Sequence, residues 1–241
     1  MPVISWLPTG KGGTKEEWID VTVNGAALET ITLTASDGTT SECVTDANGK
    51  GTAAVKVGET YTATGGVSGY EKTVAVASDT NRIKVMPEGK IIYWYGVFSE
   101  ESGGISKAYS ENPTYQGLTI STNYFRLYSN LSKQCAATVN KIDFTNYSRM
   151  NVTYKQYRTT LPDGWVGLSN TSYFVVTDRT RSPFNNSGVN TTIVFGEVYC
   201  NNTKTEIVTQ GKNISLTGSY YVEVFDNYKD AGTLTYAIWL E

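Results

Sequence analysis

The side chains that most often carry out catalysis are scarce in this chain of 241 residues. It contains no histidine, and its three cysteines, Cys43, Cys135 and Cys200, are far apart and interpreted as buried apolar residues. Without histidine, the commonest general base, the Ser-His-Asp triad and the usual zinc ligands are missing. No phosphate-binding loop, dinucleotide-binding fingerprint or Gly-x-Ser-x-Gly elbow occurs, and no Asp-x-Asp-x-Asp run for calcium. We therefore expect no enzyme, no cofactor and no metal site.

One catalytic route needs only carboxylates, because two of them can hydrolyse a glycosidic bond. The candidates are Glu100, Glu101, Asp143, Asp163, Asp178, Glu197 and Glu223. Structural roles are the simpler interpretation: Asp163 sits in a Pro-Asp-Gly turn, Asp143 tethers a strand end, and Glu197 and Glu223 face solvent. A glycoside hydrolase is therefore the last of the alternatives.

Aromatic side chains near loops are the stronger signal, because sugar-binding β-domains present ring faces beside polar groups. The densest such group is Tyr157 and Arg158, followed by Asp163 and Trp165. Tyr157 is opposite in phase to Tyr154 and is expected to point away from the core. These four residues form the predicted carbohydrate-binding rim, although aromatic residues at such positions also commonly fill a core.

Three other large apolar residues have no evident place in a core. Trp6 and Leu7 lie near the start of the chain, and Trp239 is opposite in phase to Ile238. We interpret all three as interface residues, and they predict a homo-oligomer, for which a trimer is one possibility.

The elements that must position these residues are β-strands. Val, Ile, Thr, Tyr, Phe and Trp recur throughout, with 17 Tyr and 23 Gly, and no segment has a 3.6-residue apolar repeat. The fold class is therefore predicted as all-β, with two consecutive β-sandwich domains. The net charge of −3 and the lack of a basic cluster argue against nucleic-acid binding. No apolar run is long enough to span a membrane, so membrane insertion is not expected.

The pattern divides the chain into three parts. Residues 1–17 are expected to form an apolar and flexible segment, 18–88 a first sandwich and 89–241 a second, with a turn at Met86-Pro87-Glu88-Gly89 between them. In the first sandwich, alternating runs are separated by turns such as Asn24-Gly25 and Asp37-Gly38. In the second, Lys90 to Phe98 is predicted as one central strand and 99–116 as a long polar loop.

Residues 18–86 resemble the Cna-B and carboxypeptidase-regulatory-like modules. The resemblance rests on Leu33-Thr34-Ala35-Ser36-Asp37-Gly38, Thr45-Asp46-Ala47-Asn48-Gly49, Gly58-Glu59-Thr60-Tyr61 and Gly69-Tyr70. It implies a prealbumin-like or Ig-like sandwich that serves as a spacer. Some of these modules form a Lys–Asn isopeptide bond, but Ile19 to Val23 contains no lysine, so we expect no such crosslink here.

Residues 110–241 resemble the jelly-roll domains of tail and minor structural proteins from phages of Gram-positive gut bacteria. The segments that carry this resemblance are Lys141 to Ser148, Gly218 to Val224 and Ala237 to Glu241. The resemblance implies a virion protein that assembles with itself or with other tail subunits and contacts host-surface polysaccharide.

The leading hypothesis from the sequence is a phage or prophage tail protein involved in host recognition. Because Met1 to Pro8 lacks the features of a signal peptide, the expected location is the virion, or the bacterial cytoplasm before lysis. The first alternative is a carbohydrate-binding module of a larger surface or secreted protein, and the second is a glycoside hydrolase.

Overall fold

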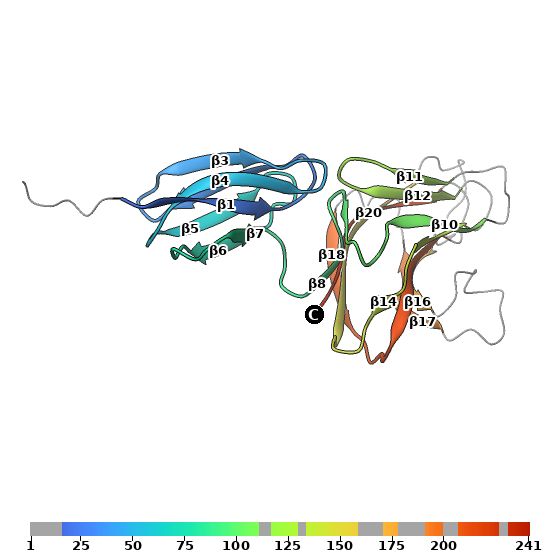
Figure 1. Ribbon diagram of the computed structural model, residues 1–241. Helices are drawn as coiled ribbons and strands as arrows, with labels where there is room; N and C mark the ends of the chain where they lie inside the picture. The colour runs from blue at the N-terminus through green and yellow to red at the C-terminus, as the bar shows by residue number, and fades with distance from the viewer. Residues whose placement is uncertain are drawn as a thin grey trace, which may run out of the picture.

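The protein consists of β-strands joined by turns, as the fold-class prediction states. A computed structural model describes residues 16–110, 117–129, 134–158, 171–177, 191–199, 207–226 and 231–241. These residues form twenty strands and no helix, and so include no helix that could span a membrane. Figure 1 shows two sandwiches side by side, joined by the segment that enters β8.

The first sandwich contains strands β1 to β7 in two sheets. One has the order β4-β1-β7 and comprises β1 (Trp18–Asn24), β4 (Lys50–Lys56) and β7 (Arg82–Lys84). The other has the order β3-β2-β5-β6 and comprises β2 (Thr30–Ala35), β3 (Thr40–Val44), β5 (Thr60–Gly65) and β6 (Glu71–Ala75). Alternation places Val21, Val23, Ile31 and Leu33 in the core between the sheets, because successive strand residues face opposite sides.

The second sandwich contains the remaining strands. One sheet has the order β10-β13-β19-β16-β17, with β14 paired to β19, and comprises β10 (Ile105–Ser110), β13 (Gln134–Thr138), β14 (Ile142–Asp143), β16 (Thr171–Thr177), β17 (Thr191–Tyr199) and β19 (Ser219–Asp226). The other has the order β11-β12-β20-β15-β18, with β8 paired to β20 and to β9. It comprises β8 (Lys90–Trp94), β9 (Val97–Phe98), β11 (Leu118–Ile120), β12 (Phe125–Ser129), β15 (Arg149–Arg158), β18 (Val208–Asn213) and β20 (Ala231–Leu240).

The core of the second sandwich lies between these two sheets. Phe125, Met150 and Tyr154 contribute from one sheet, and Phe174 and Val224 from the other. All five side chains are at most 1% exposed. Burying an apolar side chain of this size stabilises a fold by roughly 1.5–3 kcal/mol, so this cluster accounts for much of the domain's stability.

Two elements of the second sandwich differ from the sequence prediction. Lys90 to Phe98 is not one central strand, because β8 turns at Tyr95 and Gly96 and returns as β9, with Trp94 opposite Val97. The predicted loop 99–116 contains strand β10, which pairs with β13. The apolar run from Ile91 to Phe98 concealed the turn, since no Asn or Asp marks it.

A third apolar cluster lies where the sandwiches meet. Ala26 of the first sandwich packs there with Trp94, Tyr95, Ala237 and Trp239 of the second. The Tyr70 ring lies 5.6 Å from the Trp94 ring, and the Trp94 ring lies 6.0 Å from the Trp239 ring, both edge to face. A backbone hydrogen bond of 3.0 Å from Ala27 N to Tyr95 O also crosses the junction. These contacts fix the two sandwiches against each other.

Candidate functional site

The predicted carbohydrate-binding rim falls largely on parts of the chain that the structure does not describe. Tyr157 and Arg158 end strand β15, where they pair with Gly232 and Ala231 of β20. Asp163 and Trp165 lie outside the described residues. The rim therefore stays a prediction.

The residues predicted to form an oligomer interface divide in the same way. Trp6 and Leu7 lie outside the described residues. Trp239 is only 8% exposed, because it packs in the junction cluster, and its indole N–H donates to Glu241 Oε1 at 2.9 Å. Its apolar surface is thus covered within one chain, so the burial of Trp239 requires no second copy.

Two of the candidate catalytic carboxylates, Glu101 and Asp143, hold neighbouring segments together, and Glu100 is exposed. Glu101 accepts hydrogen bonds from Lys90 Nζ and from the backbone N–H of Asp143, each 3.0 Å long. Asp143 accepts from the Thr145 hydroxyl at 2.6 Å, which holds the end of β14 as expected. Asp163 and Asp178 lie outside the described residues, and only the backbone of Glu197 is described.

The expectation that Glu223 faces solvent is wrong. Its side chain is 0% exposed, on the sheet face opposite to Val222 and Val224. No described residue gives either carboxyl oxygen a hydrogen bond of normal geometry. Burial therefore raises the pKa of Glu223 to about 8, and the nearby Cys135 thiol lowers it only in part. A carboxyl group with no exposed surface cannot contact a glycosidic bond.

The structure instead gathers aromatic residues in an open cleft at the junction of the sandwiches. We call it the junction cleft; its volume is about 330 Å³ and it is lined by Val67, Tyr95, Ser121, Thr122, Asn123, Tyr124, Ile207 and Tyr236. The Tyr236 ring is central, 5.8 Å from the Tyr95 ring and 5.7 Å from the Tyr124 ring. Val67 and Ile207 are exposed at its rim. The cleft thus combines ring faces with hydroxyl and amide groups.

The β8–β9 turn forms one wall of this cleft. Tyr95 has a φ of 35° and Gly96 a φ of 100°, as in the two-residue turns that join hairpins. A side chain at position 96 would place its Cβ 1.8 Å from the Thr122 carbonyl oxygen and 2.8 Å from Ala27 Cβ. Glycine is therefore required here, both for its backbone conformation and for the close approach of three segments.

The first sandwich supplies the opposite rim, and a buried carboxylate fixes it. Glu29 is 0% exposed, and its Oε1 accepts hydrogen bonds from Val67 N at 3.0 Å and from Ser68 N at 2.8 Å. Its other oxygen, Oε2, accepts from Ala26 N at 2.8 Å. Glu29 therefore ties the turn that carries Val67 to the loop that contacts the second sandwich.

Burial also sets the protonation of the cleft. Burial raises the pKa of Tyr95, and the adjacent Tyr236 hydroxyl raises it further. Burial also raises the pKa of Tyr236, and the adjacent Tyr124 hydroxyl adds to that rise. Both phenols are therefore neutral at physiological pH, and each can donate one hydrogen bond and accept others. Such a surface suits a neutral ligand that has both an apolar face and hydroxyl groups.

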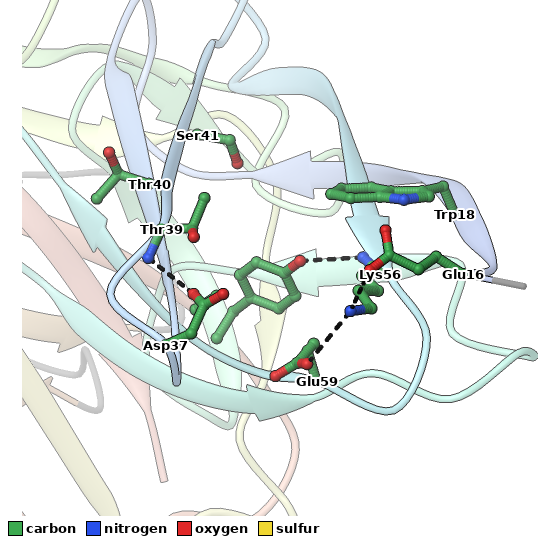
Figure 2. Close-up of a pocket in the computed structure, with 10 residues that line it drawn as sticks. Glu16, Trp18, Asp37, Thr39, Thr40, Ser41, Lys56 and Glu59 are labelled. Carbon is green, nitrogen blue, oxygen red and sulfur yellow. Dashed lines mark hydrogen bonds and ion pairs between the residues drawn. The ribbon is translucent and has the colours of Figure 1, made fainter. Parts of the chain in front are cut away.

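A second pocket lies in the first sandwich at the start of β1, and Figure 2 shows it in close-up. We call it the Trp18 pocket; its volume is about 210 Å³ and it is lined by Glu16, Trp18, Ala35, Asp37, Thr39, Thr40, Ser41, Lys56, Glu59 and Tyr61. The Trp18 side chain is 55% exposed. This pocket shares no lining residue with the junction cleft.

Sequence reasoning missed both pockets. The junction cleft draws residues from five separate parts of the chain, and no local pattern brings Val67 near Tyr236. For the Trp18 pocket, the alternation along β1 was the available signal. Ile19, Val21 and Val23 face the core, so Trp18 must face outward.

Comparison with known proteins gives no family for the chain. No family model matches it, and no curated protein does. Among solved structures, a family 29 carbohydrate-binding module in complex with mannohexaose has 9% identity and a TM-score of 0.39, over 63% of this chain and 89% of that one. A carbohydrate-binding module of the β-sandwich superfamily has 11% identity and a TM-score of 0.34, over 94% of this chain and 97% of that one. The C-terminal family 6 module of a laminarinase from Zobellia galactanivorans has 14% identity and a TM-score of 0.31, over 56% and 92%. Similarity at this level carries no argument about a ligand, so the function must be argued from side chains.

Proposed function

We propose that the protein binds carbohydrate without transforming it, and that the junction cleft is the binding site. The observation that carries this proposal is the row of three tyrosine rings, Tyr124, Tyr236 and Tyr95, along an open cleft rimmed by polar groups. A pyranose ring has one face of C–H groups and a circumference of hydroxyls. Aromatic rings desolvate the C–H face, and nearby polar groups orient the hydroxyls.

The cleft offers polar partners suited to hydroxyl groups. Ser121, Thr122 and Asn123 line it beside the neutral tyrosine hydroxyls. A hydroxyl or an amide both donates and accepts hydrogen bonds, as a sugar hydroxyl does, so the two surfaces can satisfy each other. None of the residues that line the cleft is charged, which favours a neutral sugar.

Binding without turnover is proposed because the described carboxylates do not surround this cleft. No Asp or Glu is among its lining residues, whereas glycosidic hydrolysis requires two carboxyl groups beside the scissile bond. A role in a virion or phage tail stays a prediction from the sequence. Such a protein would use the same cleft to contact host-surface polysaccharide.

The test begins with a glycan array probed with the full chain, followed by titration calorimetry with mannohexaose and β-1,4-galactotriose. These two are starting probes because both are chains of neutral sugars, and none of the residues that line the cleft is charged. Tyr124→Ala removes a half-buried ring from the cleft and should weaken binding by about 1–2 kcal/mol, or roughly 5–30-fold.

The matched control is Tyr147→Ala, which removes a half-buried tyrosine of the same sandwich that does not line the cleft. It should leave affinity unchanged. Equal affinity of the Tyr124→Ala variant and the parent for every bound glycan would refute the junction cleft as the site. Release of reducing ends during incubation would show hydrolysis instead of binding.

A further inference from the structure

The Trp18 pocket lies at the end of the first sandwich that is remote from the second. Trp18 is the first residue of β1, and Figure 1 shows that β1 begins at the far end of the first sandwich and runs toward the second. Seven strand residues span about 20–25 Å, so Trp18, at the start of β1, lies about that far from the end of β1 nearest the junction. Any ligand bound here is therefore bound independently of the cleft.

The exposed Trp18 ring is held in place. The backbone of Trp18 pairs with that of Lys56 in the antiparallel strand β4. The Lys56 ammonium donates to Glu16 Oε1 at 3.0 Å and lowers the pKa of Glu16. Figure 2 shows Glu16 beside the indole. A ring whose backbone is fixed in a sheet loses less conformational entropy on binding than one on a free loop, and Trp18 is still 55% exposed.

The floor and the charges of the pocket are also ordered. Tyr61 is 4% exposed, and its hydroxyl accepts from Lys56 N at 3.0 Å. Lys56 Nζ lies 3.0 Å from Glu16 Oε1 and 3.8 Å from Glu59 Oε1. These contacts hold the base of the pocket in place.

The rim carries groups that recognise hydroxyls. Thr39, Thr40 and Ser41 line it, and Asp37 Oδ1 accepts from Thr39 N at 2.8 Å. Among the lining residues, Glu16, Asp37 and Glu59 carry three negative charges and Lys56 one positive charge, which gives a net charge of −2. This charge repels a carboxylate, so it disfavours sugars that contain uronic or sialic acid.

We infer that the Trp18 pocket is a second carbohydrate-binding site, selective for neutral glycans, and that one chain is therefore bivalent. The inference does not rest on the junction cleft, because the two sites share no residue. It gives the first sandwich a binding role beyond that of a spacer. Two sites on one rigid chain raise the avidity for a surface with many glycans well above the affinity of either site alone.

The experiment uses the full chain on an array of neutral, uronate-containing and sialylated oligosaccharides. The variants are Trp18→Ala, Tyr124→Ala and the double substitution. The Tyr124→Ala variant should still bind neutral glycans. The double variant should give a neutral-glycan signal at least tenfold lower than that of the Tyr124→Ala variant. Uronate-containing and sialylated glycans should give no signal that depends on Trp18.

Two controls separate the ring from general surface effects. Trp18→Phe keeps an aromatic face and should retain binding. Val44→Ala removes another exposed apolar side chain of the same sandwich, one that is 65% exposed, and should change nothing. Circular dichroism should be the same for all variants, because Trp18 contributes little to the core.

The outcomes distinguish the two sites. If Tyr124→Ala abolishes all binding, the Trp18 site is refuted while the junction cleft stands. If only Trp18→Ala reduces binding, the second site stands and the junction cleft is refuted. If no array glycan binds the parent chain, both are wrong.

Discussion

Replacing Glu223 with glutamine should remove a pH dependence of stability that its burial creates. The ordinary pKa of a glutamate is 4.5, and burial raises that of Glu223 to about 8. Between these values the folded state holds a proton that the unfolded state has released. The free energy of unfolding must therefore fall as the pH rises through this window, and the contribution is constant above and below it.

The magnitude follows from the width of the window. For each pH unit in this window, the free energy of unfolding of the parent falls by about 1.4 kcal/mol relative to that of a variant without the carboxyl group. From pH 5 to pH 7 the difference in stability between the two therefore grows by about 2–3 kcal/mol. Glutamine has a similar shape and no charge. Glu223→Gln should therefore become progressively more stable than the parent over this range.

Urea unfolding of the parent and the variant at pH 5, 6, 7 and 8, followed by circular dichroism, measures this difference directly. Other titrating groups are common to both chains and cancel in the comparison. Glu223→Met is a second variant that lacks the carboxyl group and should show the same flattened profile. Parallel pH profiles for the parent and both variants would refute the argument, because they would mean that Glu223 ionises equally in the folded and unfolded states.

Two further substitutions test the junction. Gly96→Ala should destabilise the second sandwich by more than about 2 kcal/mol in urea unfolding, because a Cβ there lies 1.8 Å from the Thr122 carbonyl oxygen at a φ of 100°. Gly58→Ala is its control: φ is 86° but no atom lies within 4 Å, so only the conformational cost of about 1 kcal/mol should appear. Trp94→Ala removes the ring between Tyr70 and Trp239, and should cost about 3–5 kcal/mol and speed proteolysis at the segment before β8. Unchanged proteolysis would show that the cluster does not hold the sandwiches together.

Local pattern predicted much of the first sandwich. Its alternating runs match its strands: in β1, Ile19, Val21 and Val23 face the core, because a strand has a period of two. The same rule failed at Lys90 to Phe98, where residues on both faces are apolar and the turn at Tyr95 and Gly96 has no polar marker.

The site residues were less predictable, for physical reasons. Glu223 lies on the sheet face opposite to Val222, but strand alternation does not reveal whether the outer face of a sheet is covered. The residues of the junction cleft converge only after both sandwiches have formed. A single sequence contains no local signal for the contact of Tyr124 with Tyr236.

The position of β20 in its sheet has a consequence for the order of events during synthesis. This strand pairs with β12, β15 and β8, and it ends at Leu240. The sheet therefore lacks its central member until residues 231–240 have left the ribosome, whereas β1 to β7 have all their partners within residues 18–84. The first sandwich can fold before the strands of the second have been synthesised, and the second must wait for β20. A nascent or truncated chain that ends before Ala231 would leave three strands with exposed edges, so premature termination should produce aggregation instead of a shorter folded protein.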